Sequence, residues 1–125
     1  AKGYLLEQAD MKYFWNHYVK TPDDGNDPYY SPLAASDHSG LPPALIACAE
    51  FDPPCDDGRN YAAKLRSSGV PVTFRLYKGM IHGFLSMSGV LDQPNVVINE
   101  IAEQVRAVFH GISSVAGLSD RQKLL

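Results

Sequence analysis

The sequence predicts an α/β fold built around parallel strands. Residues 44–49 form a continuous apolar run, which is typical of a parallel strand covered on both faces. In residues 72–77, the apolar side chains of Val72, Phe74 and Leu76 alternate with those of Thr73, Arg75 and Tyr77. This alternation indicates a second strand with one covered and one mixed face. A helical pattern lies between the two runs, so that strand, helix and strand fit within about 35 residues as a right-handed parallel crossover.

The composition excludes several classes of protein. The 125 residues are 45% hydrophobic and 20% charged, which fits one soluble domain with a core. A net charge of -3 gives no basic surface for nucleic acid or an anionic membrane. No apolar run approaches the roughly 20 residues that span a bilayer, and no signal peptide is recognisable. We therefore expect no nucleic-acid partner, no membrane span and a cytoplasmic location.

The chain before the first strand is predicted to hold one helix and one long loop. Residues 10–19 place large apolar side chains at spacings of three and four, which predicts a helix with one apolar stripe. The stripe consists of Met11, Phe14, Trp15 and Tyr18. Residues 20–43 contain five prolines and two glycines among polar residues, so they are predicted to be loop. So long a loop is unusual, which indicates either a functional segment or one packed against something else, and we expect it to pack against parts of the protein outside this chain.

Three further features follow the first strand. Asp56 is predicted to cap the amino terminus of the crossover helix, and Gly69 to end it in a left-handed conformation. Residues 94–112 have apolar side chains on one face and are predicted to form a last helix. Residues 114–125 have weak periodicity and are expected to be a frayed tail.

The two cysteines are too few for a disulfide scaffold. Cys48 lies in an apolar run and is expected to be a buried, reduced thiol. Cys55 follows the predicted strand end, where an extended chain would carry it too far from Cys48 to bridge. The histidines outside the predicted site have no metal-ligand spacing, so we predict no metal and no cofactor.

Two titratable residues follow the two predicted strands. Asp52 comes directly after the first strand, and His82 lies a few residues past the second. Because the carboxyl ends of parallel strands open on one side of a sheet, we expect both residues on one rim. A carboxylate there can hold the imidazole in one tautomer while the ring transfers protons. The alternative is a surface aspartate capping a turn and a loop histidine without a partner.

The sequence also resembles a known family. The runs S-P-L-A-A-S-D-H-S-G-L-P-P, A-E-F-D-P-P-C-D-D-G and Y-K-G-M-I-H-G-F resemble the end of the hormone-sensitive-lipase-like esterases, which have the α/β-hydrolase fold. The resemblance implies that Asp52, which opens the D-P-x-x-D element, is the triad acid. It implies that His82 of the H-G-F element is the triad base. Phe84 and Leu85 would then line a pocket for the acyl or alcohol group, with core packing as the alternative.

The nucleophile of that family is missing from the sequence. Neither a G-x-S-x-G elbow nor an H-G-G-G element occurs in residues 1–125. We therefore interpret residues 1–125 as the carboxyl-terminal portion of one α/β-hydrolase catalytic domain, inactive by itself. The parent is predicted to be a carboxylic ester hydrolase that acts on short acyl esters.

Two other functions stay open at this stage. One is a catalytically incompetent α/β module with a binding or structural role. The other keeps the fold but changes the chemistry, because related hydrolases include peptidases and lactonases. For any of these functions, the exposed edge of the first strand favours pairing with another chain or a homo-oligomer.

Overall fold

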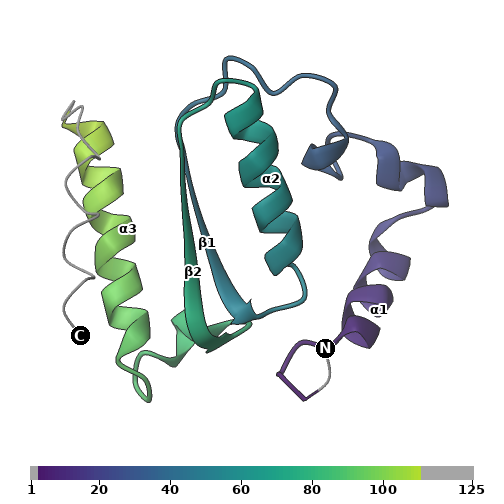
Figure 1. Ribbon diagram of the computed structural model, residues 1–125. Coiled ribbons are helices and arrows are strands. Elements are labelled where there is room, and N and C mark those ends of the chain that lie inside the picture. Colours follow the sequence, from purple (N-terminus) through teal and green to yellow (C-terminus); the bar gives the residue numbers. More distant parts are fainter. Residues whose placement is uncertain (1–2, 111–125) are drawn as a thin grey trace. The chain divides into compact units, whose positions relative to one another are not determined.

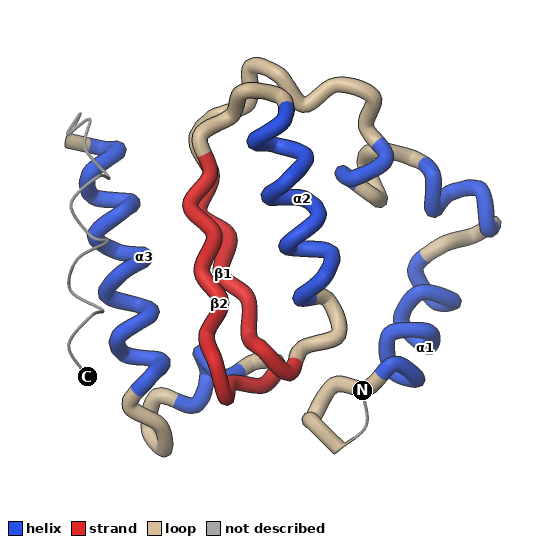
Figure 2. Tube along the Cα trace, in the orientation of Figure 1, coloured by secondary structure: helices blue, strands red, loops and turns tan. Residues whose placement is uncertain are grey.

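The computed structural model describes residues 3–110, which fall in two compact units. The first unit runs from Ala1 to Phe84 and contains α1, β1, α2 and β2, and the second begins at Leu85 and contains α3. Figure 1 traces these elements along the chain, and Figure 2 separates the helices in blue from the two strands in red. The predicted frayed tail, residues 114–125, lies outside the described residues.

The centre of the first unit is the predicted parallel crossover. β1 (Ala44–Phe51) and β2 (Val72–Ile81) are parallel neighbours, in register from Ala44 opposite Val72 to Ala49 opposite Tyr77. α2 (Cys55–Ser67) connects them and packs on both strands, as its place beside the sheet in Figure 1 illustrates. The predicted α/β class and the parallel pairing are confirmed.

The ends of α2 test two predictions. The carboxyl-terminal prediction is confirmed, because Gly69 has a φ of 79° and its N–H donates to the carbonyl of Arg66 at 3.0 Å. The amino-terminal prediction is wrong. The helix begins at Cys55 with Pro54 at the capping position, so Asp56 already lies in the first turn. There its carboxylate accepts a hydrogen bond from Arg59 at 2.8 Å instead of capping the helix.

Both strands extend further than their apolar patterns indicate. The continuous run ended at residue 49, but β1 continues to Phe51. Residues from Gly79 onward were expected to be loop, yet β2 continues to Ile81. The additional residues form an irregular end of the ladder, where the register shifts after Ala49. As a result, each strand ends next to one of the two predicted site residues.

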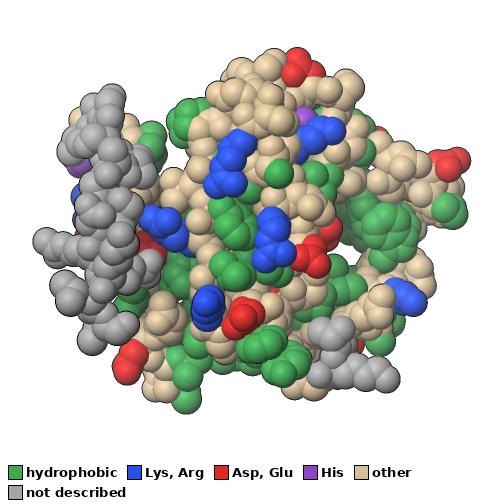
Figure 3. All heavy atoms as spheres, viewed as in Figure 1, with side chains coloured by type: hydrophobic (Ala, Val, Ile, Leu, Met, Phe, Trp, Pro, Cys, Tyr) green, Lys and Arg blue, Asp and Glu red, His purple; other side chains and the backbone are tan. Residues whose placement is uncertain are grey.

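The segment before β1 folds as a helix and two short 3₁₀ turns. α1 (Gln8–Tyr18) matches the predicted helix to within two residues. The expected loop contains 3₁₀ helices at Pro22–Asn26 and Pro32–Ala34. The apolar stripe of α1 stays largely uncovered in the described structure, with Trp15 41% and Tyr18 74% exposed. Figure 3 shows hydrophobic side chains in green on the visible face, between charged side chains in blue and red.

The second unit is built around α3 (Gln93–Phe109), which confirms the predicted last helix. Pro94 stands in its first turn, where the missing N–H has no intrahelical partner to lose. The predicted end of this helix, at residue 112, lies outside the described residues. No helix in residues 3–110 is both long enough and apolar enough to cross a membrane.

Candidate active site

The structure brings Asp52 and His82 into direct contact. Asp52 is the first residue after β1, and His82 is the first residue after β2. The Nδ1 atom of His82 lies 3.0 Å from both carboxylate oxygens of Asp52. A protonated Nδ1 donates to this carboxylate, which leaves the lone pair on Nε2 to accept a proton.

The two side chains differ in exposure. The Asp52 side chain is 14% exposed, whereas the His82 side chain is 45% exposed. The carboxylate is therefore shielded from water by the protein, while much of the imidazole remains open to another group. This is the arrangement needed by a proton-transferring histidine that is oriented from behind by an aspartate.

A tight turn holds Asp52 between β1 and α2. The carbonyl of Asp52 accepts a hydrogen bond from the N–H of Cys55 at 3.0 Å. Pro53 and Pro54 lie inside this turn, and their rings restrict the backbone φ angles there. The chain passes directly from the turn into α2, so the carboxylate is fixed by elements on both sides.

The residues after His82 hold the histidine in place. Gly83 has a φ of 70°, a conformation that favours glycine, and it turns the chain away from β2. Phe84 is only 6% exposed, and its ring lies 5.7 Å from the ring of Tyr77. The H-G-F sequence thus combines the histidine with a turn and an anchor in the core.

Phe84, one of the two predicted substrate pocket residues, does not line the open space near Asp52. Phe84 is buried against Tyr77, which favours packing for its ring, and Leu85 belongs to the second unit. Their role in binding substrate remains a prediction implied by the resemblance.

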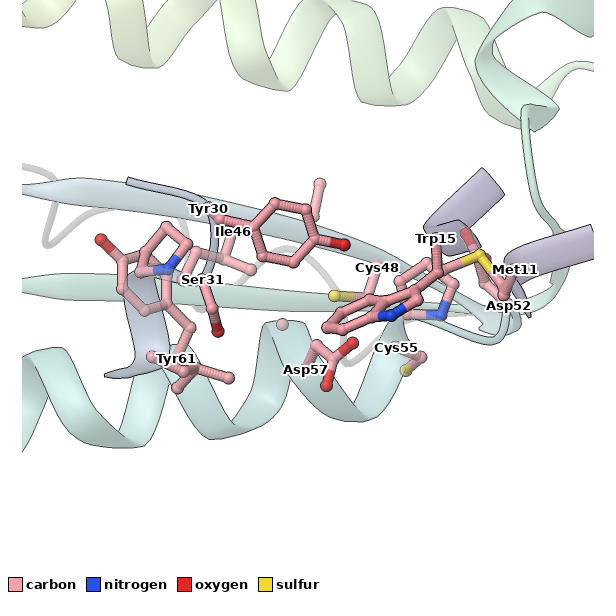
Figure 4. Close-up of a pocket in the computed structure, with 15 residues that line it drawn as sticks. Met11, Trp15, Tyr30, Ser31, Ile46, Cys48, Asp52, Cys55, Asp57 and Tyr61 are labelled. Atoms are coloured by element: carbon pink, nitrogen blue, oxygen red, sulfur yellow. The ribbon is translucent and has the colours of Figure 1, made fainter. Parts of the chain in front are cut away.

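A pocket of about 660 Å³ adjoins the carboxylate in the first unit. Figure 4 shows side chains from α1, the long loop, β1 and α2 around it. Asp52 and Trp15 both line this pocket, whereas His82 does not. No sequence pattern pointed to the contributions of Tyr30 and Asp57 to this pocket.

The two cysteines are closer together than the sequence suggested. Cys48 and Cys55 are both buried, both free, and both line this pocket. Burial raises the pKa of the Cys48 thiol, and the neighbouring Cys55 thiol raises it further. The expected wide separation is wrong because the turn at Pro53 and Pro54 brings the start of α2 back beside β1. Cys48 is a protonated thiol at neutral pH.

Among residues 3–110, no group of three or more His, Cys, Asp or Glu side chains is arranged to hold a metal ion. The chemistry that the geometry of this site supports is that of the Asp52–His82 pair. Such a pair transfers protons, but it needs a nucleophile and an oxyanion-binding group to cleave an acyl bond.

Comparisons with known proteins identify the family of the chain. A family model described as alpha/beta hydrolase fold matches residues 1–86. LipN, a carboxylic ester hydrolase of Mycobacterium tuberculosis, is 41% identical over 108 residues, which cover 86% of this chain and 29% of LipN. An ethyl acetate hydrolase of Pseudomonas putida is 35% identical over 106 residues, covering 85% of this chain and 33% of that protein.

A solved structure also resembles the chain. An esterase from Pyrobaculum calidifontis superposes with a TM-score of 0.80 at 36% identity, over 83% of this chain and 34% of the esterase. The chain belongs to the α/β-hydrolase family, as its sequence motifs predicted. It spans about a third of the length of the relatives it matches.

Proposed function

We propose that this chain supplies the acid and the base of a serine carboxylic ester hydrolase, as part of a longer protein. The observation that carries the proposal is the contact of 3.0 Å between His82 Nδ1 and each carboxylate oxygen of Asp52. The names of the relatives, a carboxylic ester hydrolase and an ethyl acetate hydrolase, support the reaction class. In this proposal the chain is the carboxyl-terminal portion of one catalytic domain and is inactive alone.

The pair has a defined role at each step of ester cleavage. His82 Nε2 accepts the proton of a serine hydroxyl supplied by the longer protein, and the serine oxygen attacks the ester carbonyl. His82 then gives this proton to the leaving alcohol, and an acyl-enzyme remains. Water repeats the sequence and releases the acid. Asp52 keeps the imidazole in the required tautomer and stabilises the imidazolium that forms.

The proposed substrates are esters with short acyl chains. The name of the ethyl acetate hydrolase supports this choice, because that relative acts on an ester of a two-carbon acid. We propose that Phe84 and Leu85 contribute to the surroundings of the acyl or alcohol group. A panel of p-nitrophenyl esters measures the preference, together with a lactone and a peptide substrate. Faster turnover of the lactone or peptide would assign the site to a related hydrolase class.

The experiment uses the longer protein, assayed with p-nitrophenyl acetate and butyrate. His82→Ala is expected to remove nearly all turnover because no other group in the pair can accept the serine proton. His110→Ala is the matched control, since His110 is an exposed histidine just beyond α3. Full activity of the His82→Ala enzyme would refute the proposal.

One observation favours a second function. The chain itself has no G-x-S-x-G or H-G-G-G element, which suits a catalytically incompetent α/β module with a binding or structural role. The sequence of the gene upstream of Ala1 separates the two functions. A reading frame that carries both motifs favours the esterase, and one that lacks them favours the module.

Two further proposals concern the setting of the chain. The described sheet has two strands, so each strand has one unpaired edge, and an exposed edge can pair with another chain. We propose that the isolated chain forms a homo-oligomer through such an edge, and a monomer in light scattering would contradict this.

We also propose a cytoplasmic location, which the free thiols of Cys48 and Cys55 support. Fractionation of the host cell tests the location.

A further inference from the structure

The ladder between β1 and β2 changes its register just before the active-site pair. Ala49 is opposite Tyr77, but the next paired residues are Phe51 and Ile81. One residue of β1, Glu50, therefore spans three residues of β2. Such a bulge leaves backbone groups of the longer strand without their usual partners in the ladder.

A side chain satisfies one of these backbone groups. The N–H of Gly79, at the middle of the bulge, donates to the Oε2 atom of Glu50 at 2.7 Å. Gly79 has a φ of 74°, which glycine adopts without the steric cost that other residues pay. Backbone conformation and side-chain acceptor together give the bulge one defined shape.

This hydrogen bond lies next to both members of the pair along the chain. Glu50 is two residues before Asp52 on β1, and Gly79 is three residues before His82 on β2. The ladder ends where Phe51 pairs with Ile81, and the contact of Asp52 with His82 follows immediately. The position of each strand end relative to the other therefore depends on how the bulge closes.

We propose that Glu50 is a positioning residue, which holds Gly79 and thereby sets the distance between Asp52 and His82. This inference rests on the proposed function of the pair. Glu50 itself is exposed, and its hydrogen bond goes to the backbone of Gly79 rather than to the side chain of Asp52 or His82. It acts through the backbone of β2, and its oxygen atom is needed as an acceptor rather than as a charge.

The size of the expected effect follows from the geometry of catalysis. A misplacement of about 1 Å in a reacting group can lower the rate by about 100-fold. Without an acceptor, Gly79 turns its N–H to water, and the end of β2 can shift by a fraction of such a distance. We therefore expect a loss in kcat of about 10- to 100-fold, with KM changed by less than about threefold.

Two substitutions at Glu50 separate the acceptor from the other properties of the side chain. In the longer protein, Glu50→Met keeps the length of the side chain but removes both oxygens, and it should show the full loss in kcat. Glu50→Gln keeps an oxygen acceptor without the charge, and it should retain kcat to within about threefold. Glu103→Ala, an exposed glutamate on α3, is the matched control and should behave as wild type.

A second readout does not depend on turnover. The Nδ1 proton of His82, observed by NMR, should be protected from exchange in the wild type and in Glu50→Gln, and exchange rapidly in Glu50→Met. If the wild type is inactive or His82→Ala keeps its activity, the proposed function fails, and this proton still decides the role of Glu50. Unchanged kcat and proton protection in Glu50→Met would overturn the inference. So would a loss in Glu50→Gln as large as in Glu50→Met.

If Glu50→Met does not fold, Glu50→Ala serves as the variant without an acceptor. A loss in kcat of about tenfold or more in Glu50→Ala, with wild-type kcat and a protected His82 proton in Glu50→Gln, supports the inference, and wild-type kcat in both variants overturns it. Thermal unfolding of each variant shows whether that variant folds. A defect confined to KM would also overturn the inference, because a residue that only aligns the pair leaves substrate binding unchanged.

Discussion

The crossover and α1 belong to the same unit but cover their own apolar surfaces to very different degrees. In the crossover, Ala62 is 1% and Leu65 2% exposed, because α2 packs on both strands. In α1 no residue is buried, and Phe14 remains 57% exposed. A strand–helix–strand unit contains both sides of its interface within one stretch of chain, whereas a single amphipathic helix needs a partner from elsewhere.

This difference extends to the functional site. The contact between Asp52 and His82 lies at the carboxyl ends of β1 and β2, so the crossover brings the two side chains together. The pocket beside Asp52 is lined partly by the crossover and partly by α1 and the loop, including Trp15 and Tyr30. We infer that the acid–base pair is set by this chain, while the final shape of the pocket depends on what covers α1.

The largest stability effect is expected in the buried face of α2. Leu65→Ala should lower the free energy of unfolding by about 2–5 kcal/mol, the usual range for a buried leucine. Met11→Ala on α1 should cost less than about 1 kcal/mol, because Met11 is 37% exposed and leaves no closed cavity. Chemical denaturation of the isolated chain measures both. Equal losses would show that α1 is as well packed as the crossover.

Two glycines give a closer test of the same contrast. A Cβ atom at Gly58 would lie 2.5 Å from the Cys48 sulfur, and one at Gly25 would lie 2.6 Å from the Trp15 ring. Cys48 is a residue of β1 with 9% of its surface exposed and its side chain lies against α2, whereas Trp15 is 41% exposed and can move outward. We expect the steric contact in Gly58→Ala to lower the free energy of unfolding by about 1–3 kcal/mol. The higher helix propensity of alanine offsets a smaller part of this loss. Gly25→Ala should stay within about 0.5 kcal/mol of wild type.

A double substitution provides the control for the glycine test. Cys48→Ala removes the sulfur that the new methyl group would meet. In that background, Gly58→Ala should therefore cost less than it does in the wild type, and the difference is the coupling energy of the contact. Additive effects in thermal unfolding would mean that the close approach of β1 and α2 is not the cause.

The smallest effect concerns pH. Burial and the Cys55 thiol raise the pKa of Cys48 above its ordinary value of 9.0 in the folded protein. The folded state therefore holds this proton more tightly than the unfolded state, and stability is lost as the pH rises above the unfolded pKa. Unfolding free energies measured on both sides of that pH should show a decrease that Cys48→Ala reduces. An identical pH dependence in the variant would contradict this assignment.

The sequence predicted the elements that depend on local pattern. The parallel pairing of β1 with β2 and the meeting of Asp52 with His82 follow from hydrophobic periodicity and from the direction of parallel strands. The strand ends did not follow, because the bulge depends on a contact between Glu50 and Gly79, which are 29 residues apart. No local pattern encodes such a pair.

The start of α2 was missed for a similar reason. Asp56 has the usual side chain for a cap, but the turn through Pro53 and Pro54 places the cap at Pro54 and begins the helix at Cys55, two residues earlier than a cap at Asp56 would. The same turn places Cys55 near Cys48. Distance estimates from an extended chain fail where prolines reverse its direction.

The most direct test of the central claim is whether Asp52 and His82 act as one unit in the longer protein. We predict that His82→Ala lowers kcat/KM by about 10⁴-fold or more, and that Asp52→Asn also causes a large loss. The double variant should be no worse than His82→Ala, because Asp52 acts only through the imidazole. Losses that multiply in the double variant, or full activity in either single variant, would contradict the account.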